Sequence, residues 1–256
     1  MIRGLYTAAA GMMVKQVQCD VISQNLANVS TPGYRRDQVA VASFPEMLLA
    51  RLNDSPSPSL LGFLGTGCVV EEISTSQREG IIEESGNPLD LALRGNAYFV
   101  VKDALGTVFY TRNGGFAIDQ DGKLITRDGL AVMGEIDGEW VEVYVPDGNL
   151  EVTKEGTLHG ARTLDGRKVS RLALVAGPAP GDLWQKVGDS LFQSIAVPAQ
   201  PEDFQVLQGF REISNVNPVQ EMVNLISVFR AYEANQKVIQ AIDITLDKAV
   251  NEVGRV

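Results

Sequence analysis

The sequence predicts a mixed α and β fold, with a β-rich antiparallel central domain and long N- and C-terminal helices that form a coiled-coil-like terminal domain. Three observations predict it. Near both ends of the chain, apolar residues recur at alternating spacings of three and four, which is helical spacing. From Val69 to about Phe192 they alternate with period two instead, which is typical of strands. Turn pairs such as Asp121-Gly122 interrupt this region at hairpin spacing, and no βαβ rhythm occurs.

The first helix is expected to run from the start of the chain to about Val29 or Ser30. Its apolar seam consists of Ile2, Leu5, Ala9, Met12, Gln16, Cys19, Ser23 and Leu26. A second edge beside it consists of Ala10, Val14, Val17 and Val21. Thr31-Pro32-Gly33 ends the helix, because Pro32 disfavours helix at the residue before it and Gly33 permits a turn. The matching patterns at the two ends predict that the terminal helices pack together.

Residues 35–68 are expected to be a linker and inter-subunit segment. Val39, Val41 and Phe44 alternate as in a strand, and Pro45 to Leu52 could form a short helix. Asn53 to Ser59 is expected to be a flexible or extended connector, since it is rich in serine and proline. The apolar residues from Leu60 to Leu64 are too few for a helix core and are expected to dock on another surface.

The central domain is expected to span residues 69–214. Leu89, Leu91 and Leu93 alternate, and Tyr98 to Val101 is a buried apolar run. Phe204 to Ile213 is expected to be a final strand that leads into the terminal helix.

The C-terminal helix carries the strongest pattern, and its domain is expected to span residues 215–256. Asn217 can cap the helix, Pro218 suits the first helical position, and Glu221 favours the positive end. At 1.5 Å per residue such a helix is ~50 Å long. Its seam consists of Leu225, Val228, Tyr232, Asn235, Ile239, Ile242, Leu246, Ala249 and Val253, beside a second edge of Met222, Ile226 and Phe229. Two apolar edges predict partners on both sides, although a helix lying across its own domain is an alternative.

Composition narrows the class of function. The 256 residues carry a formal net charge of −10 without a basic patch, which argues against nucleic acid and against an anionic membrane surface. No run of 18 apolar residues occurs, so we expect no membrane insertion. Cys19 and Cys68 do not make a disulfide framework. The start faintly resembles a cleavable signal, but the helical pattern continues through the supposed cleavage site, so we expect no cleavage.

The sequence motifs for catalysis and for ligand binding are incomplete, and we expect no catalytic, cofactor or metal site. His159 is the only histidine, and no Gly-x-Ser-x-Gly motif accompanies it. Asp119 to Gly122 lacks the further ligands of a calcium loop and favours a hairpin turn. Gly65-Thr66-Gly67 lacks the lysine of a phosphate loop. The pairs Glu71-Glu72 and Glu83-Glu84 place neighbouring carboxylates on opposite faces of a strand, so they need not converge.

The chain resembles a known family at both ends and in parts of the middle. The stretches that carry the resemblance are residues 1–6, 10–12, 25–34 (Asn-Leu-Ala-Asn-Val-Ser-Thr-Pro-Gly-Tyr), 91–99, 110–114, 214–217, 221–226 and 230–235. This pattern resembles the bacterial flagellar axial proteins, the rod and hook family. The size of the middle region is most similar to that of the rod proteins, because hook proteins usually carry a larger one.

The resemblance implies a structural subunit of the flagellar basal-body rod that assembles into a torque-transmitting helical tube. Its implied partners are copies of itself, neighbouring rod and hook proteins, and the flagellar type III export apparatus, with a location outside the cytoplasmic membrane. The expected assembly interface consists of Leu5, Met12, Leu26, Asn28, Thr31, Pro32, Gly33, Tyr34, Leu225, Val228, Tyr232, Ile239, Ile242 and Leu246. The first terminal piece would span residues 1–34. The sequence leaves open whether the rod position is proximal or distal.

Two other functions remain open. One is a hook or hook-junction subunit, which a differently curved polymer would reveal. The other is a secreted β-rich binding or hydrolytic domain with an incidental helical stalk. That function predicts a concave pocket with convergent carboxylates.

Overall fold

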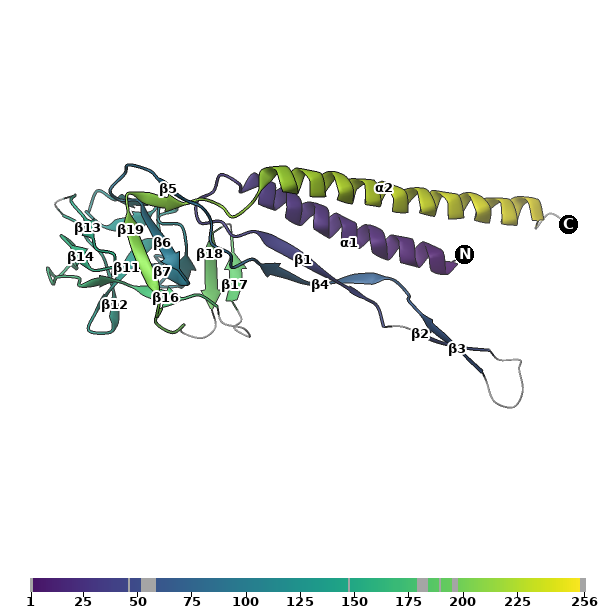
Figure 1. Ribbon diagram of the computed structural model, residues 1–256, viewed down its shortest axis with the longest axis horizontal. Helices are drawn as coiled ribbons and strands as arrows, with labels where there is room; N and C mark the ends of the chain where they lie inside the picture. The colour runs from purple at the N-terminus through teal and green to yellow at the C-terminus, as the bar shows by residue number, and fades with distance from the viewer. Residues whose placement is uncertain are drawn as a thin grey trace. The chain divides into compact units, whose positions relative to one another are not determined.

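A computed structural model gives the fold (Figure 1). It describes residues 2–45, 47–51, 59–146, 148–178, 184–188, 190–194 and 198–253. The chain forms two compact units. Unit 1 contains residues 1–27, 37–76 and 217–256, and unit 2 contains residues 28–36 and 77–216. The mixed α and β class with antiparallel strands is confirmed.

Unit 1 contains two antiparallel helices, α1 (Ile2–Ala27) and α2 (Pro218–Lys248), which lie side by side (Figure 1). A Cβ atom added at Gly4 would lie 3.3 Å from Ile242 Cδ1, and one added at Gly11 would lie 2.9 Å from Asn235 Nδ2. Small residues on α1 therefore let α2 approach closely. A π-helical turn, η1 (Ala249–Val253), follows α2 directly.

The start of α2 follows the capping signals of the sequence. The Asn217 side chain accepts hydrogen bonds from the backbone N–H groups of Val219 and Gln220, at 3.1 and 3.2 Å. Pro218 occupies the first turn, where its missing N–H costs nothing, and Glu221 lies near the positive helix end. The expected start is confirmed. The first helix ends at Ala27, two or three residues before the expected end.

Unit 1 also contains a long β-ribbon. Strand β1 (Asp37–Ser43) pairs with β4 (Cys68–Thr75), and β2 (Met47–Arg51) pairs with β3 (Ser59–Leu64), both antiparallel. The expected strand around Val39 is confirmed. The short helix expected over Pro45 to Leu52 is wrong, because this segment finds hydrogen-bond partners in β3 that its local sequence does not reveal. The connector expected over Asn53 to Ser59 lies outside the described residues up to residue 58, and Ser59 begins β3.

Unit 2 consists of short antiparallel strands. They are β5 (Ile82–Glu84), β6 (Leu91–Gly95), β7 (Ala97–Lys102), β8 (Val108–Thr111), β9 (Phe116–Ile118), β10 (Leu124–Thr126), β11 (Ala131–Ile136), β12 (Glu139–Glu142), β13 (Glu151–Val152), β14 (Leu158–His159), β15 (Arg171–Leu172), β16 (Leu174–Ala176), β17 (Trp184–Val187), β18 (Leu191–Ser194), β19 (Phe204–Gln208) and β20 (Phe210–Glu212). The largest sheet has the order β17-β18-β8-β7-β11-β10-β9, with β12 and β15 beside β11 and β16 beside β7. Smaller pairs are β13–β14, β19–β6 and β20–β5.

Strand β7 lies at the centre of the packing in unit 2, since both of its faces are covered. Phe99 and Val101 belong to one apolar cluster, and Tyr98 and Val100 belong to a second cluster with Phe192. A strand covered on both faces has a continuous apolar sequence rather than an alternating one. The buried run expected from Tyr98 to Val101 is therefore confirmed.

The turns of unit 2 follow the Gly signals of the sequence, with one correction. Gly122 N–H donates to Asp119 O at 2.9 Å, so this segment is the expected hairpin turn between β9 and β10. The single strand expected from Phe204 to Ile213 is instead β19 and β20. Gly209 separates them with φ of 80°, a left-handed conformation that interrupts a strand.

Candidate functional site

The motif of residues 28–34 forms tight turns in unit 2. Thr31 N–H donates to Asn28 O at 3.2 Å, and Thr31 Oγ1 donates to Asn28 Oδ1 at 3.0 Å. Gly33 has φ of 69°, and a Cβ atom there would lie 2.4 Å from the backbone nitrogen of Asn113. Only glycine fits at this position, since a side chain would be strained and would also collide with the backbone. Gly33 N–H donates to Glu212 O at 2.9 Å.

Glu212 lies at the centre of a buried charged cluster, which we define as Arg35, Arg112 and Glu212. The three side chains are 1%, 2% and 2% exposed. Glu212 Oε1 lies 2.8 Å from Arg35 Nη2, and Glu212 Oε2 lies 3.4 Å from Arg112 Nη1. The same Oε1 accepts the backbone N–H of Gly80 at 2.8 Å. The Glu212 carboxylate therefore forms ion pairs with two buried guanidinium groups and accepts a hydrogen bond from one backbone N–H.

Both arginines also donate to backbone carbonyl groups. Arg35 Nη1 donates to Arg78 O, and Arg112 donates to the carbonyl oxygens of Leu93 and Gly95. Burial lowers the pKa of Arg112 below its usual value, while Glu212 opposes that shift. Two cations with one anion leave the cluster as defined positive, and the carbonyl dipoles, the charge of Glu79 and the Tyr98 ring add further stabilisation.

Tyr98 covers one side of this cluster. The Arg112 guanidinium lies 4.9 Å from the centre of the Tyr98 ring, within cation–π range. The Tyr98 hydroxyl donates to Gln77 Oε1 at 2.6 Å. Burial raises the pKa of Tyr98, and the positive charges of Arg35 and Arg112 partly oppose this. The hydroxyl therefore stays protonated and remains a donor at neutral pH.

Asn215 makes a second set of contacts beside the Glu212 cluster. Its Oδ1 accepts the backbone N–H of Arg36 at 2.8 Å, and its Nδ2 donates to Arg78 O at 2.8 Å. Lys186 Nζ donates to Arg35 O at 3.0 Å and lies 3.9 Å from the centre of the Tyr34 ring. The segment after α1 is thus tied to distant parts of the β unit.

The residues expected at an assembly interface lie in two different units. Asn28, Thr31, Pro32, Gly33 and Tyr34 belong to unit 2, where Gly33 and Tyr34 are buried. The other nine lie on the helices of unit 1 and are half-buried: Leu5, Met12, Leu26, Leu225, Val228, Tyr232, Ile239, Ile242 and Leu246. Since α1 and α2 pack against each other, much of this seam is covered within one chain.

The second edge of α2 is exposed. It forms a patch over the first three turns, which we call the α2 patch, and Phe229 remains 50% exposed. The residues of the α2 patch are Val219, Met222, Val223, Ile226 and Phe229. Single exposed apolar residues are ordinary, but five on one side of a helix form an unusual surface.

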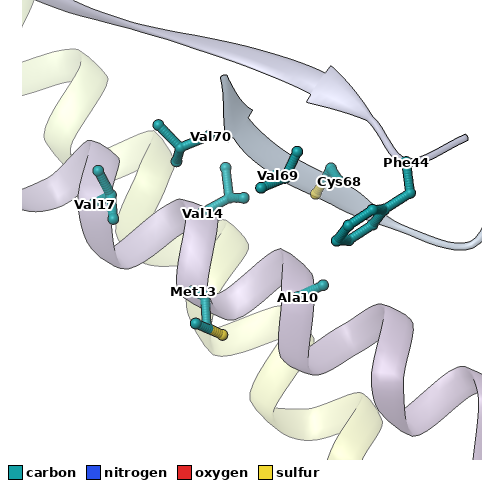
Figure 2. Close-up of a pocket in the computed structure, with 8 residues that line it drawn as sticks. All are labelled: Ala10, Met13, Val14, Val17, Phe44, Cys68, Val69 and Val70. Atoms are coloured by element: carbon teal, nitrogen blue, oxygen red, sulfur yellow. The ribbon is translucent and has the colours of Figure 1, made fainter. Parts of the chain in front are cut away.

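The second edge of α1 has a different environment from that of α2. Val14 and Val21 are buried, and α1 packs against β1 and β4. An apolar groove of ≈ 250 Å³ remains between α1 and the ribbon (Figure 2). Its lining residues are Ala10, Met13, Val14, Val17, Phe44, Cys68, Val69 and Val70. The sequence pattern did not reveal that the chain covers this edge with its own strands.

The residues considered for catalysis or metal binding do not form a common site among the described residues. His159 is exposed in β14, and the carboxylates of Glu71, Glu72, Glu83 and Glu84 are exposed on strands. Within the described ranges, no three His, Cys, Asp or Glu side chains are placed to hold a metal ion. Of the helices that the structure describes, neither has the length and apolar character of a membrane span.

Sequence reasoning missed the Glu212 cluster and its neighbour Asn215. Arg112 and Asn215 lie in stretches that carry the family resemblance, but local spacing gives no reason to pair them with anything. Arg112 and Glu212 are 100 residues apart in the chain. One signal could have found the cluster: Arg35 directly follows the turn motif and its last residue, Tyr34. If the turn is buried, the charge of Arg35 is buried with it and needs an oppositely charged or hydrogen-bonding partner.

Comparison with known proteins gives the family. Three family models match: "Flagella basal body rod protein" over residues 5–35, "Flagellar hook protein FlgE/F/G D1 domain" over residues 92–159, and "Flagellar basal body rod FlgEFG protein C-terminal" over residues 207–252. The flagellar basal-body rod protein FlgG of Buchnera aphidicola subsp. Schizaphis graminum is 30% identical, with 97% of this chain and 98% of the relative covered.

Two further relatives agree. FlgG of Agrobacterium fabrum is 31% identical, with 94% of this chain and 96% of the relative covered. The flagellar hook-basal body complex protein FlhO of Bacillus subtilis is 29% identical, with both chains covered completely. The chain therefore belongs to the flagellar basal-body rod protein family and is a structural protein of the flagellar basal body.

Proposed function

We propose that the chain assembles with copies of itself, through its helical unit, into a helical tube that transmits torque. One observation carries the proposal: the α2 patch stays exposed although the seam of the same helix is already packed against α1. A long helix with one covered and one uncovered apolar side is suited to packing between neighbours. The chain's own α1 accounts for the first side, and a neighbouring copy would account for the second.

The energy of such a contact is moderate. Full burial of a large apolar side chain contributes about 2 kcal/mol, so the exposed halves of five residues contribute roughly 5 kcal/mol. Association costs at least about 4 kcal/mol, so one patch alone gives weak binding. A subunit that touches several neighbours adds such contacts together, which favours a polymer over a dimer.

The α2 patch and the groove beside α1 are different surfaces on the same unit. Contacts between unlike surfaces produce open helical polymers when the rotation does not close a ring. This supports a tube. We further propose that residues 1–34 and 215–256 form its coiled-coil-like axial domain, residues 35–68 an inter-subunit segment, and residues 69–214 the outer domain.

The family supports several finer proposals. The relatives' names place them in the basal-body rod, so neighbouring rod and hook proteins are the proposed partners of this chain. Export by the flagellar type III apparatus follows from the family resemblance alone, and no cofactor or catalytic activity is part of the proposal. A hook or junction position is the second candidate, since one matching family model is named for the hook protein and one relative for the hook-basal body complex.

Sedimentation and electron microscopy of the full chain test the proposal. We expect the wild type to form concentration-dependent polymers. The double variant Ile226→Ser/Phe229→Ser should sediment as a monomer with unchanged helical circular dichroism. Lys237→Ser, on the same helix, is the matched control and should polymerise normally. Polymers from the double variant, or a wild type that stays monomeric at every concentration, would contradict the proposal.

A further inference from the structure

The chain passes between unit 1 and unit 2 four times, at residues 27/28, 36/37, 76/77 and 216/217. On the unit 2 side, these crossings belong to three connecting segments: residues 28–36, 77–80 and 212–216. Each segment could in principle attach to a different part of the β unit. The hydrogen bonds instead bring all three together around Glu212 and Asn215.

Glu212 joins all three connecting segments, itself being part of the third. Its side chain binds Arg35 of the first segment and Gly80 of the second. Its backbone carbonyl accepts from Gly33 of the first. Arg112 then connects the carboxylate to the β-strands by its bonds to Leu93 and Gly95.

Asn215 repeats this arrangement three residues later. It accepts from Arg36, donates to Arg78, and its backbone N–H lies 3.4 Å from Tyr34 O. The second segment is also bound at its first residue, where Gln77 accepts from the Tyr98 hydroxyl. Three of the four crossings, at 36/37, 76/77 and 216/217, therefore lie within two residues of Arg35, Gln77 and Asn215, which are side chains of this network. The crossing at 27/28 lies seven residues before Arg35.

Among the three residues of the cluster, replacing Glu212 is expected to disturb the connecting segments most. It is the acidic member of the cluster as we define it, and it neutralises part of two arginines that are almost fully buried. Without its charge, the two buried cations would lose their buried counter-ion and repel each other more strongly, although carbonyl groups, the Tyr98 ring and the charge of Glu79 would still stabilise Arg112. The connecting segments would then separate before the apolar clusters of unit 2 loosen.

We infer that Glu212 is a positioning residue that fastens the three connecting segments into one joint on unit 2, with Asn215 as its second fastening point. The consequence for assembly rests on the proposed function: a tube that transmits torque would place force on the connecting segments where they are fastened to unit 2. The joint itself does not depend on that function. It is a property of the single chain.

Hydrogen exchange of the monomeric full chain, read by mass spectrometry, tests the inference. In Glu212→Gln we expect amides in residues 31–36, 78–81 and 213–216 to exchange about tenfold faster or more, with strand β7 unchanged. Trypsin should then cut faster after Arg35 than it does in the wild type, where the Arg35 side chain is buried. Glu84→Gln, an exposed glutamate in the neighbouring strand β5, is the matched control and should behave as wild type.

Asn215→Ala is a second variant for the case that Glu212→Gln does not fold. It removes the side-chain hydrogen bonds to Arg36 and Arg78 without exposing a charge, and it should loosen the chain around these two residues while the backbone bond to Tyr34 remains. Unchanged exchange in a folded Glu212→Gln, or an equal increase over β7 and the connecting segments, would overturn the inference. Because exchange is measured on the monomer, a wild type that fails to polymerise would contradict the proposed function and leave this result intact.

Discussion

Asn25 and Asp37 are joined by a reciprocal pair of hydrogen bonds. Asn25 Nδ2 donates to Asp37 O at 2.8 Å, and Asp37 N–H donates to Asn25 Oδ1 at 2.9 Å. Asn25 thus satisfies both backbone groups of the first residue of β1, as a neighbouring strand would. Asp37 Oδ1 in turn accepts from Thr75 Oγ1 at 2.7 Å, which connects α1 to both β1 and β4.

Replacing Asn25 should loosen this connection. In Asn25→Ala, the backbone N–H and C=O groups of Asp37 lose their hydrogen bonds to Asn25, so we expect unit 1 to lose about 2 kcal/mol of stability. Urea unfolding followed by helical circular dichroism measures this. Gln16→Ala, an exposed position on α1, is the control and should change little. A loss under about 0.5 kcal/mol for Asn25→Ala would show that water replaces the bonds.

A comparison of Gly33 with Gly86 distinguishes two reasons for a glycine, which are a left-handed backbone and a lack of space for a Cβ atom. Both have left-handed backbones, with φ of 69° and 71°, but only Gly33 has backbone atoms within reach of an added Cβ. We expect Gly86→Ala to cost about 1 kcal/mol from backbone strain alone. Gly33→Ala should cost about 3 kcal/mol or more, because strain and collision add. Thermal unfolding of both variants measures the two losses of stability. Equal losses would show that the collision at Gly33 makes no contribution.

The pH dependence of stability should include a contribution from Glu142. Burial raises its pKa, but hydrogen bonding and attraction from Lys123, together with the Tyr144 hydroxyl, outweigh burial and hold it below the usual value of 4.5. A lowered pKa means that the contribution is complete above that value and is lost as the pH falls below it. Carboxyl NMR titration should show the Glu142 pKa rising in Lys123→Met. No rise would assign the shift to other groups.

The two faces of α2 should differ in their tolerance of charge. Ile239→Asp places a carboxylate on the half-buried seam, and we expect a loss of about 2–3 kcal/mol in the stability of the helix pair. Ile244→Asp makes the same change on the exposed side and should stay within about 0.5 kcal/mol of wild type. Urea unfolding followed by circular dichroism compares them. Equal losses would mean that the seam is not where the helices meet.

Features with local causes were predictable from the sequence. Asn217 and Pro218 start α2 through contacts within a single turn, and glycine-containing turns separate the strands. The alternation of three and four placed the seam on the side of α2 that is half-buried. These predictions succeeded because the interacting residues are neighbours in the chain.

Features that depend on distant partners were not predictable. Strand β2 forms because β3 pairs with it, and the Arg112–Glu212 contact joins residues 100 positions apart. The partner of the second edge of α1 was not predictable for the same reason. Its apolar residues indicated a covered edge, and the ribbon of the same chain packs against it. The periodicity of apolar residues predicts which face of a helix is buried, but it does not identify the element that covers this face.

Asn235 interrupts an otherwise apolar seam, and its place opposite Gly11 restricts how the helices can align. An added Cβ at Gly11 would lie only 2.9 Å from Asn235 Nδ2, so the amide occupies the space that glycine leaves free. A slip of one helical turn would bring Asn235 opposite Thr7 or Lys15, where a side chain stands in place of the glycine hydrogen. A single polar residue in a helical seam commonly fixes one register at a cost in stability. The pair Gly11–Asn235 thus selects one axial alignment of α1 and α2 among those that the apolar repeat alone would permit.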